Sequence, residues 1–279
     1  MNTVGKKITI GKIIVYTILI FTSVIVVFPF YWMITTALDG DAITRLPFPP
    51  RFWPAEPSTW GFYVTWRNVP FPRLYLNTII VALGTIIVSL SCATLAAYSF
   101  SKIQFRGWKV CMMLTICVLM IPTEVIMVPQ FFIFAAFGLV DSYWAIWLPG
   151  MCFVFGTLLV KKFMDTVPSS IREAAMIDGA SELSIFARIY LPLCSAILVT
   201  LTILLFLFSW NDLLWPLLVL RTNSLHTIQL GLLTMMGRAQ FLPSPHFAAM
   251  LLSIIPVLVV YLILQRYIVA SISMSGVKQ

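Results

Sequence analysis

The chain has 279 residues, of which 60% are hydrophobic and only 10% charged, and its formal net charge is +8. Soluble globular proteins are about 45–50% apolar and about 25% charged, so this composition excludes a water-soluble enzyme, a disordered linker protein and a disulfide scaffold. One crossing of a hydrocarbon core takes about 20 apolar residues. We therefore predict an all-α polytopic membrane protein with six transmembrane helices.

Long uncharged runs mark the predicted spans. Backbone amides find no water in lipid, so such runs should be helical, and the polar–apolar alternation of a membrane barrel is absent from the sequence. The predicted spans cover about residues 13–38, 74–100, 108–127, 142–162, 193–220 and 247–267. The first run is too long for a signal peptide and lacks a small-residue cleavage site, so we expect an uncleaved helix.

One further uncharged run, residues 125–140, is shorter than a full span and is interrupted by Pro129 and Gly138. If this segment were a crossing, every loop after residue 140 would be placed on the opposite side of the membrane. We therefore interpret it as an interfacial or re-entrant segment on the outer side.

The distribution of basic residues predicts the orientation of the spans. With six spans and the segment 1–12 inside, the inner segments carry 12 of the 18 Lys and Arg residues and only four of the ten Asp and Glu residues. Both the N-terminus and the tail 271–279 are then cytoplasmic, around a membrane domain of residues 13–270. The excess positive charge thus lies on the cytoplasmic side, where membrane proteins carry it, and it does not require a nucleic-acid partner. The sequence carries no motif for binding nucleic acid.

The outer loop after the first span, residues 39–73, is rich in proline and tryptophan. Tryptophan is favoured at the level of the lipid headgroups because its ring is amphipathic. We expect this loop to form a folded cap on the outer surface.

The inner segment 161–191 is the longest and most charged cytoplasmic stretch, and from residue 168 onward its residues predict two short helices joined by a turn. Ser169 and Ser170 can cap the first helix, and Gly179 can end it in the left-handed conformation. Ser181 can cap a second helix running to Tyr190. Pro192 should then open the next membrane helix, where its missing N–H does no harm. We call residues 168–192 the elbow.

The elbow contains E-A-A, three residues, G, nine residues and I-x-L-P, beginning at Glu173. This pattern resembles the EAA signature of importer-type ABC transporter permeases. The resemblance implies that the elbow is a coupling helix that docks into a groove on a separate ATPase, with Glu173 as a polar anchor and Gly179 as the turn. The implied coupling set is Glu173, Ala174, Ala175, Asp178, Gly179, Ile189, Leu191 and Pro192.

The segment from Ser209 to Leu217, SWNDLLWPL, is similar to the carbohydrate branch of this family, the maltose-type permeases, as is the end of the chain from Gln265. The resemblance implies a subunit of the bacterial inner membrane that passes a sugar or oligosaccharide. Its implied partners are a second homologous permease, two ATPase subunits and an extracytoplasmic solute-binding protein. ATP and Mg would be used by the ATPase chains, and this chain would bind no cofactor.

Catalytic motifs are missing from the sequence. There is no G-x-x-x-x-G-K-[ST] phosphate-binding loop, so ATP hydrolysis cannot occur on this chain. The two histidines, His226 and His246, belong to no zinc-protease motif and no triad. We predict that both lie on the surface of outer loops, and that the chain has neither a catalytic nor a metal site.

Polar residues at membrane depth are costly and often face a transport pathway. The candidates are Trp210, Asn211, Asp212 and Trp215 in the fifth span, together with Asn77 and Glu124. Tryptophan can stack on the apolar face of a sugar, and amides and carboxylates can bond hydroxyls. The alternative is structural: Asn211 and Asp212 cap or hydrogen-bond a neighbouring helix, and the tryptophan rings anchor the membrane interface.

Two other functions remain open at this point. An ABC permease could carry another solute, such as a glycerol-phosphate compound or a polyamine. An ion-coupled secondary transporter would need internal repeats and ionisable residues at the membrane midplane, and the sequence shows no repeat. An intramembrane enzyme would need a catalytic cluster, which the residues do not supply.

Overall fold

The structure is a computed structural model that describes residues 10–236 and 242–275. It divides into two compact units, Met1–Pro70 with Thr234–Ile255 and Phe71–Leu233 with Pro256–Gln279, which are described separately. Within the described residues the regular elements are all helical, with one isolated β-bridge between Asp39 and Pro57. The predicted cytoplasmic ends, 1–12 and 271–279, fall mostly or partly outside the described residues.

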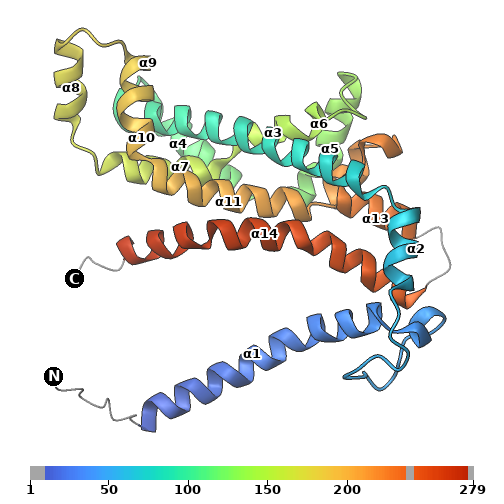
Figure 1. Cartoon of the computed structure of the whole chain (residues 1–279). Coiled ribbons are helices and arrows are strands. Elements are labelled where there is room, and N and C mark those ends of the chain that lie inside the picture. The colour runs from blue at the N-terminus through green and yellow to red at the C-terminus, as the bar shows by residue number, and fades with distance from the viewer. Residues whose placement is uncertain (1–9, 237–241, 276–279) are drawn as a thin grey trace. The chain divides into compact units, whose positions relative to one another are not determined.

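The first unit contains α1 (Ile10–Ala37), the short 3-10 helix η1 (Gly40–Ile43), α2 (Trp60–Asn68) and the beginning of α14 (Pro243–Ser275) (Figure 1). The apolar side chains of α1 are exposed over most of its length, as expected of a helix that faces lipid. Two hydrogen bonds join α14 to this unit: Ser244 Oγ donates to Ala37 O at 3.0 Å, and Thr65 Oγ1 donates to Pro245 O at 2.8 Å.

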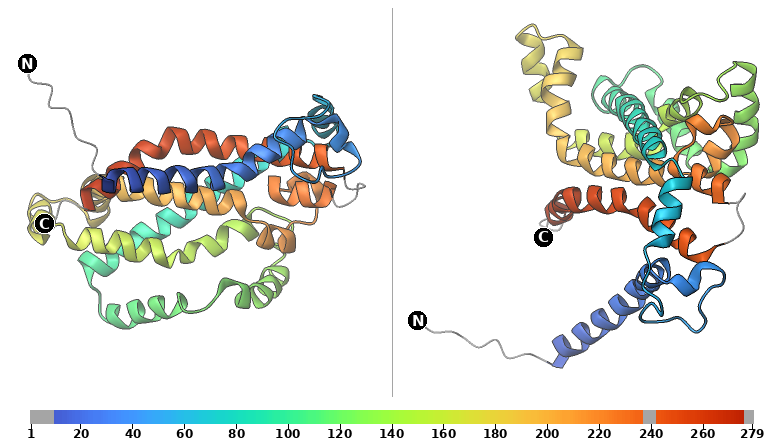
Figure 2. Two further views of the ribbon diagram at one scale, coloured as in Figure 1. Left: turned by 90° about the horizontal axis from the view of Figure 1, so that it is seen from below. Right: turned by 45° about the vertical axis from the view of Figure 1, so that its right-hand side comes forward.

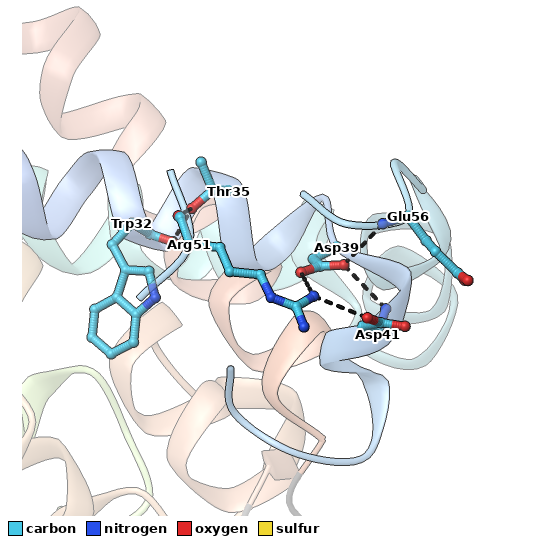
Figure 3. A network of polar contacts seen from close by, with 6 residues as sticks. All are labelled: Trp32, Thr35, Asp39, Asp41, Arg51 and Glu56. Atoms are coloured by element: carbon cyan, nitrogen blue, oxygen red, sulfur yellow. Dashed lines mark hydrogen bonds and ion pairs between the residues drawn. The ribbon is translucent and has the colours of Figure 1, made fainter. Parts of the chain in front are cut away.

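The predicted cap of residues 39–73 is folded, and its loop is organised around Asp39, whose side chain is only 2% exposed (Figure 3). Asp39 Oδ1 accepts hydrogen bonds from the N–H groups of Asp41 and Glu56, at 3.1 and 3.4 Å. Arg51 pairs with Asp41 at 2.9 Å and with Asp39 at 3.4 Å. The hydrogen bond to Asp41 is the main cause that raises the pKa of Arg51. This network closes a loop that has little regular structure.

The core of the second unit consists of three helices that pack side by side: α3 (Phe71–Tyr98), α7 (Val154–Asp165) and α11 (Ser195–Asn211) (Figures 1 and 2). The buried face of α3 carries small residues at helical spacing, including Ala82, Ser89, Ala93 and Ala97. Small residues let helices approach closely, which stabilises association in lipid.

The second unit also contains the part of α14 from Pro256 onward and several helices shorter than α11. These shorter helices are α4 (Trp108–Val118), α5 (Thr123–Ala136), α6 (Trp144–Trp147), α8 (Ser169–Ile177), α9 (Glu182–Ile185), α10 (Leu191–Leu193), α12 (Leu214–Val219) and most of α13 (Ile228–Met236). There are π-helical turns at Ser99–Ile103 and Phe186–Tyr190 and 3-10 turns at Leu148–Cys152 and Asn223–Leu225. A side chain at Gly84 in α3 would collide with the Trp147 indole, which lies 2.2 Å from the position of the missing Cβ. Glycine there permits α6 and α3 to touch.

Three helices of the described chain are long and apolar enough to cross a membrane, and six crossings result if each bent helix pair is one span. The predicted third span, 108–127, is wrong as a continuous helix: α4 and α5 meet at 105°. Pro122 explains the break, because it lacks an N–H and disfavours a helical conformation in the residue before it. Segment 125–140, predicted to lie outside, forms most of α5.

The predicted fifth span, 193–220, is also interrupted, and the structure corrects it at both ends. Glu182–Leu193 and Ser195–Asn211 meet at 77°, so the membrane helix α11 begins at Ser195 and not at Pro192. At the other end, Asp212 adopts an extended conformation between α11 and α12.

Candidate functional site: the elbow and a pocket at the two ends of α11

The elbow begins with α8, which ends in a glycine turn. The N–H of Gly179 donates to Met176 O and the N–H of Ala180 to Ala175 O, each at 3.0 Å. This is the Schellman pattern of helix termination, and Gly179 has φ +83°. The predicted left-handed end of the first helix at Gly179 is therefore confirmed.

Of the two elbow helices α8 and α9, only α9 has an N-cap residue whose side chain makes a capping hydrogen bond. Ser181 Oγ accepts a hydrogen bond from Ser184 N, which confirms Ser181 as the N-cap of α9. The prediction that Ser169 or Ser170 caps α8 is wrong. Both lie inside the first turn of α8, and the capping position is held by Pro168, which makes no side-chain cap bond.

An ion pair closes the two arms of the elbow onto each other. The guanidinium of Arg172 on α8 binds the carboxylate of Glu182 at the start of α9. The same carboxylate accepts a hydrogen bond from Tyr98 Oη on α3, at 2.6 Å. The bond to Glu182 is the main cause that raises the pKa of Arg172. Tyr98, Arg172 and Glu182, which we call the elbow triad, tie both arms to α3.

The π-helical turn after α3 makes a second polar connection. Ser101 Oγ donates to Asp165 Oδ1 at 2.6 Å, and Lys102 Nζ donates to Val167 O at 2.6 Å. Lys161 pairs with Asp165 at 2.8 Å. The chain entering the elbow is therefore held to α3, just as the elbow triad holds its arms.

The predicted coupling residues fall into two groups in the structure. Glu173, Ala174, Asp178, Gly179 and Pro192 are exposed. Ala175, Ile189 and Leu191 are partly buried against the hydrophobic core that includes Tyr190 and Leu201. These three residues stabilise the attachment of the elbow and present less surface to a partner.

Sequence reasoning missed the large apolar side chains exposed on the elbow. Ile177 is 86% exposed and Leu183 is 69% exposed, and Met176 and Ile171 are also exposed. The signal was present in the sequence, since α8 combines polar and apolar residues on different faces, but the turn at Gly179 decides which of them remain uncovered.

The other end of α11 borders a pocket of about 820 Å³. Of the residues predicted to face a pathway, four line it: Glu124, Asn211, Asp212 and Trp215. Thr85, Gln130 and Ser209 line it as well and were not predicted. The pocket brings together α3, the break between α4 and α5, and the break between α11 and α12.

The other two predicted pathway residues are placed elsewhere. Trp210 is 1% exposed, with its ring near those of Tyr75 and Phe206. Asn77 is buried, and its side-chain amide donates to Ser224 O and His226 O, each at 2.9 Å. Asn77 therefore fastens a loop to α3.

The residues at the α11–α12 break also have structural bonds. Asp212 Oδ1 accepts from Trp215 N at 3.4 Å, Asn211 Nδ2 donates to Leu207 O at 2.8 Å, and Trp215 Nε1 donates to Ala145 O at 2.9 Å. Asp212 and Trp215 therefore hold neighbouring helices, whereas Asn211 bonds its own helix, and all three side chains also line the pocket.

The prediction that both histidines lie on the surface of outer loops is wrong: His246 is partly buried within α14, and His226 is only 5% exposed. It follows the 3-10 turn Asn223–Leu225, and its backbone is held by Asn77 on α3. Within the described residues, no three His, Cys, Asp or Glu side chains lie close enough together to hold a metal ion.

Comparison with known proteins decides the family. Residues 85–274 match the sequence profile described as "Binding-protein-dependent transport system inner membrane component". The chain belongs to this family. It is a multi-pass inner-membrane permease of an ABC importer, a transport subunit and not an enzyme. The permease is part of a complex with a binding protein, ATPases and a permease partner.

Two relatives illustrate the range of solutes named for this family of permeases. The arabinooligosaccharides transport system permease protein AraQ of Halalkalibacterium halodurans is 30% identical over 245 residues, covering 88% of this chain and 83% of AraQ. The sn-glycerol-3-phosphate transport system permease protein UgpE of Yersinia pestis is 30% identical over 261 residues, covering 91% of this chain and 93% of UgpE.

The fold of the permease also matches a solved structure. The match is a chain in the crystal structure of a bacterial ABC transporter involved in the import of the acidic polysaccharide alginate. The TM-score is 0.83 at 23% sequence identity, and the match covers 96% of this chain and 99% of that one. This similarity establishes the all-helical permease fold.

Proposed function

We propose that this permease passes a sugar or oligosaccharide that an extracytoplasmic binding protein delivers. We also propose that the elbow binds a partner ATPase and transmits its conformational change to the membrane helices. The observation that carries the proposal is the construction of the elbow. It presents Ile177 and Leu183 to a partner while the elbow triad fixes its arms to α3. A surface that is both exposed and firmly attached can transmit a displacement.

The exposed face of the elbow supports a protein partner. Apolar side chains as large as Ile177 and Leu183 are well suited to the core of a protein interface, and charged residues to its polar rim. Glu173 and Asp178 are exposed on the same short elbow and supply the charge. An ATPase groove with apolar walls and basic edges would fit this surface. Two such ATPase subunits, which use ATP and Mg, would bind the elbows of this chain and of a second homologous permease.

The orientation follows from the same proposal. The ATPases of the complex work in the cytoplasm, so the elbow lies on the inner side, and both termini are cytoplasmic with six crossings. The cap around Asp39 is then on the outer side, where the binding protein arrives. Coupling requires that each conformational state binds its partners with a different affinity.

Two observations support a sugar as the solute. AraQ, a relative that spans most of this chain, is named for arabinooligosaccharides. The pocket at the end of α11 is lined by hydroxyl, amide and carboxylate groups beside Trp215, and these groups bond sugar hydroxyls. UgpE is equally similar and is named for sn-glycerol 3-phosphate, so this compound is the second candidate.

The test is uptake by the complete complex in proteoliposomes. We expect ATP-dependent uptake of a neutral oligosaccharide, and we expect Ile177→Glu to insert into the membrane normally but to abolish both uptake and co-purification of the ATPases. Ile177→Leu is the matched control and should behave as the wild type. Normal uptake by Ile177→Glu would contradict the coupling role, and uptake of sn-glycerol 3-phosphate alone would contradict the sugar assignment.

A further inference from the structure

The pocket at the end of α11 lies where two helix breaks meet. Pro122 separates α4 from α5, and Asp212 separates α11 from α12. Both breaks release backbone and side-chain polar groups that a continuous helix would satisfy internally. The pocket of about 820 Å³ that results is large enough for a small ligand.

Two buried hydroxyl groups in the pocket wall have no hydrogen-bond partner within the protein. Ser209 is 7% exposed, and its Oγ makes no hydrogen bond. Thr85 Oγ1 is likewise buried without a partner. Since almost all buried polar groups in proteins are bonded, these two hydroxyls keep unused hydrogen-bonding capacity in the wall of the pocket.

The charge of the wall limits what that ligand can be. The wall contains two carboxylates, Glu124 and Asp212, and the lining residues include no lysine or arginine. A phosphate or a carboxylate would be repelled by Glu124 and Asp212 and would find no cation to bond. Hydroxyl groups, in contrast, donate to carboxylates and accept from Ser209 and Thr85.

We propose that this pocket, formed by Thr85, Glu124, Gln130, Ser209, Asn211 and Asp212, is a binding subsite on this chain for neutral polyhydroxylated solutes and that it discriminates against anions. The proposal deepens the proposed function, on which it rests, by placing part of the solute recognition on this subunit. Trp215 and Phe208 provide apolar surface in the same wall, and aromatic surface suits the apolar face of a sugar ring.

Binding is measured on the purified, complete complex by saturation-transfer NMR, without binding protein or ATP. Arabinotriose, maltotriose and raffinose serve as neutral probes, sn-glycerol 3-phosphate as the anionic probe and spermidine as the cationic probe. We expect at least one neutral probe to bind and the anion to give no signal.

Two variants connect binding to the pocket. Ser209→Ala should raise the Kd of the neutral probe by about 3- to 10-fold, the usual range for one neutral hydrogen bond. Asp212→Asn should raise it by about tenfold, because bonds to a charged group are stronger. The amide oxygen of asparagine can still accept the hydrogen bond from Trp215 N, so α12 should be retained. The matched controls, Ser195→Ala on α11 and Glu56→Gln in the outer cap, lie outside the pocket and should leave the Kd unchanged.

The outcomes separate the two proposals. If the complex takes up a sugar but neither Ser209→Ala nor Asp212→Asn changes neutral-probe binding, the subsite is wrong and the proposed function stands. If sn-glycerol 3-phosphate or spermidine binds and no neutral probe does, the inferred selectivity is overturned. Absence of uptake of every sugar by the wild-type complex contradicts the proposed function, and the Kd values still decide whether the subsite exists.

Discussion

The two ends of α11 are built in opposite ways. At the elbow end, Arg172, Glu182 and Tyr98 satisfy one another, and Ser101, Lys102 and Asp165 are all bonded. At the pocket end, Ser209 and Thr85 are buried without partners, beside two carboxylates. Tyr190 Oη at the elbow end is also buried without a partner, so the difference lies in the charged groups. They bond one another at the elbow end, which stabilises its shape, and they line a pocket at the other end, where a ligand can reach them.

Among changes to the bonds within the two ends of α11, breaking the elbow triad should have the largest effect. Glu182→Ala removes the acceptor of both Arg172 and Tyr98. Bonds to charged groups contribute about 1.5–3 kcal/mol, and the lower end applies because the Glu182 side chain is 39% exposed. We therefore expect sugar uptake to fall about tenfold, measured in proteoliposomes at constant protein insertion.

Tyr98→Phe provides the control for that experiment. It removes one hydrogen bond but leaves the ion pair between Arg172 and Glu182, so uptake should fall less than in Glu182→Ala. Equal loss in both variants would mean that the ion pair contributes nothing, and full uptake in both would show that the elbow does not need the triad.

The next effect concerns the turn of the elbow. Gly179 has φ +83° and open space around the position of a Cβ, so substitution costs backbone strain without a collision. Gly179→Val should destabilise the turn by roughly 1–2 kcal/mol, whereas Gly179→Asn should be milder because asparagine tolerates this conformation. Co-purification with the ATPases should decrease in the same order. The reverse order would rule out strain as the cause.

A comparable change at the pocket end should affect local stability. Trp215→Phe keeps an aromatic ring against Phe134 but removes the bond to Ala145 O. The loss should be about 1 kcal/mol, seen as faster hydrogen exchange in α12 and α6 with the elbow unchanged. Exchange that quickened equally at the elbow would show that the two ends are not independent.

The smallest effect is a pH dependence near the pocket end. The hydroxyl of Thr222 and the N–H groups of Thr222 and Arg221 donate to Asp141 and lower the pKa of that carboxyl. Because the folded pKa is below the unfolded value, this stabilisation is complete above about pH 4 and is lost as the pH falls through the folded pKa.

Asp141→Asn tests this contribution. The residue has φ +64°, which asparagine tolerates. The variant should therefore be slightly less stable at neutral pH and should lose part of the acid sensitivity of thermal unfolding. An unaltered acid limb in the unfolding curve would exclude Asp141 as a contributor.

The elbow could be predicted because its signals are local. Gly179 and Ser181 each act on residues within four positions, so the sequence alone indicates the turn and the second cap. Pro168 was the exception: with a proline before Ser169, α8 begins without a side-chain cap. The Arg172–Glu182–Tyr98 contacts join residues up to 84 positions apart, and no local pattern indicates them.

The pocket was only half predictable. Costly polar groups in an apolar run pointed to Asn211, Asp212 and Glu124. Trp210 and Trp215 could not be distinguished, because the break at Asp212 changes which side of the chain each faces. Ser209 and Thr85 gave no signal, since a serine or threonine in a membrane helix usually bonds its own backbone, as Thr94 does with Leu90 O.

From Ser195 to Asn211, α11 contains neither glycine nor proline, and its helix is unbroken between the two bends that limit it. Sharp kinks in helices arise mainly at such residues, so this rod of roughly 25 Å should resist bending. A movement imposed on the elbow end of α11 should therefore reach its pocket end with little bending of the helix. If the elbow receives a displacement from the ATPase, as proposed above, this seventeen-residue segment is the part of the chain that would carry it to the pocket.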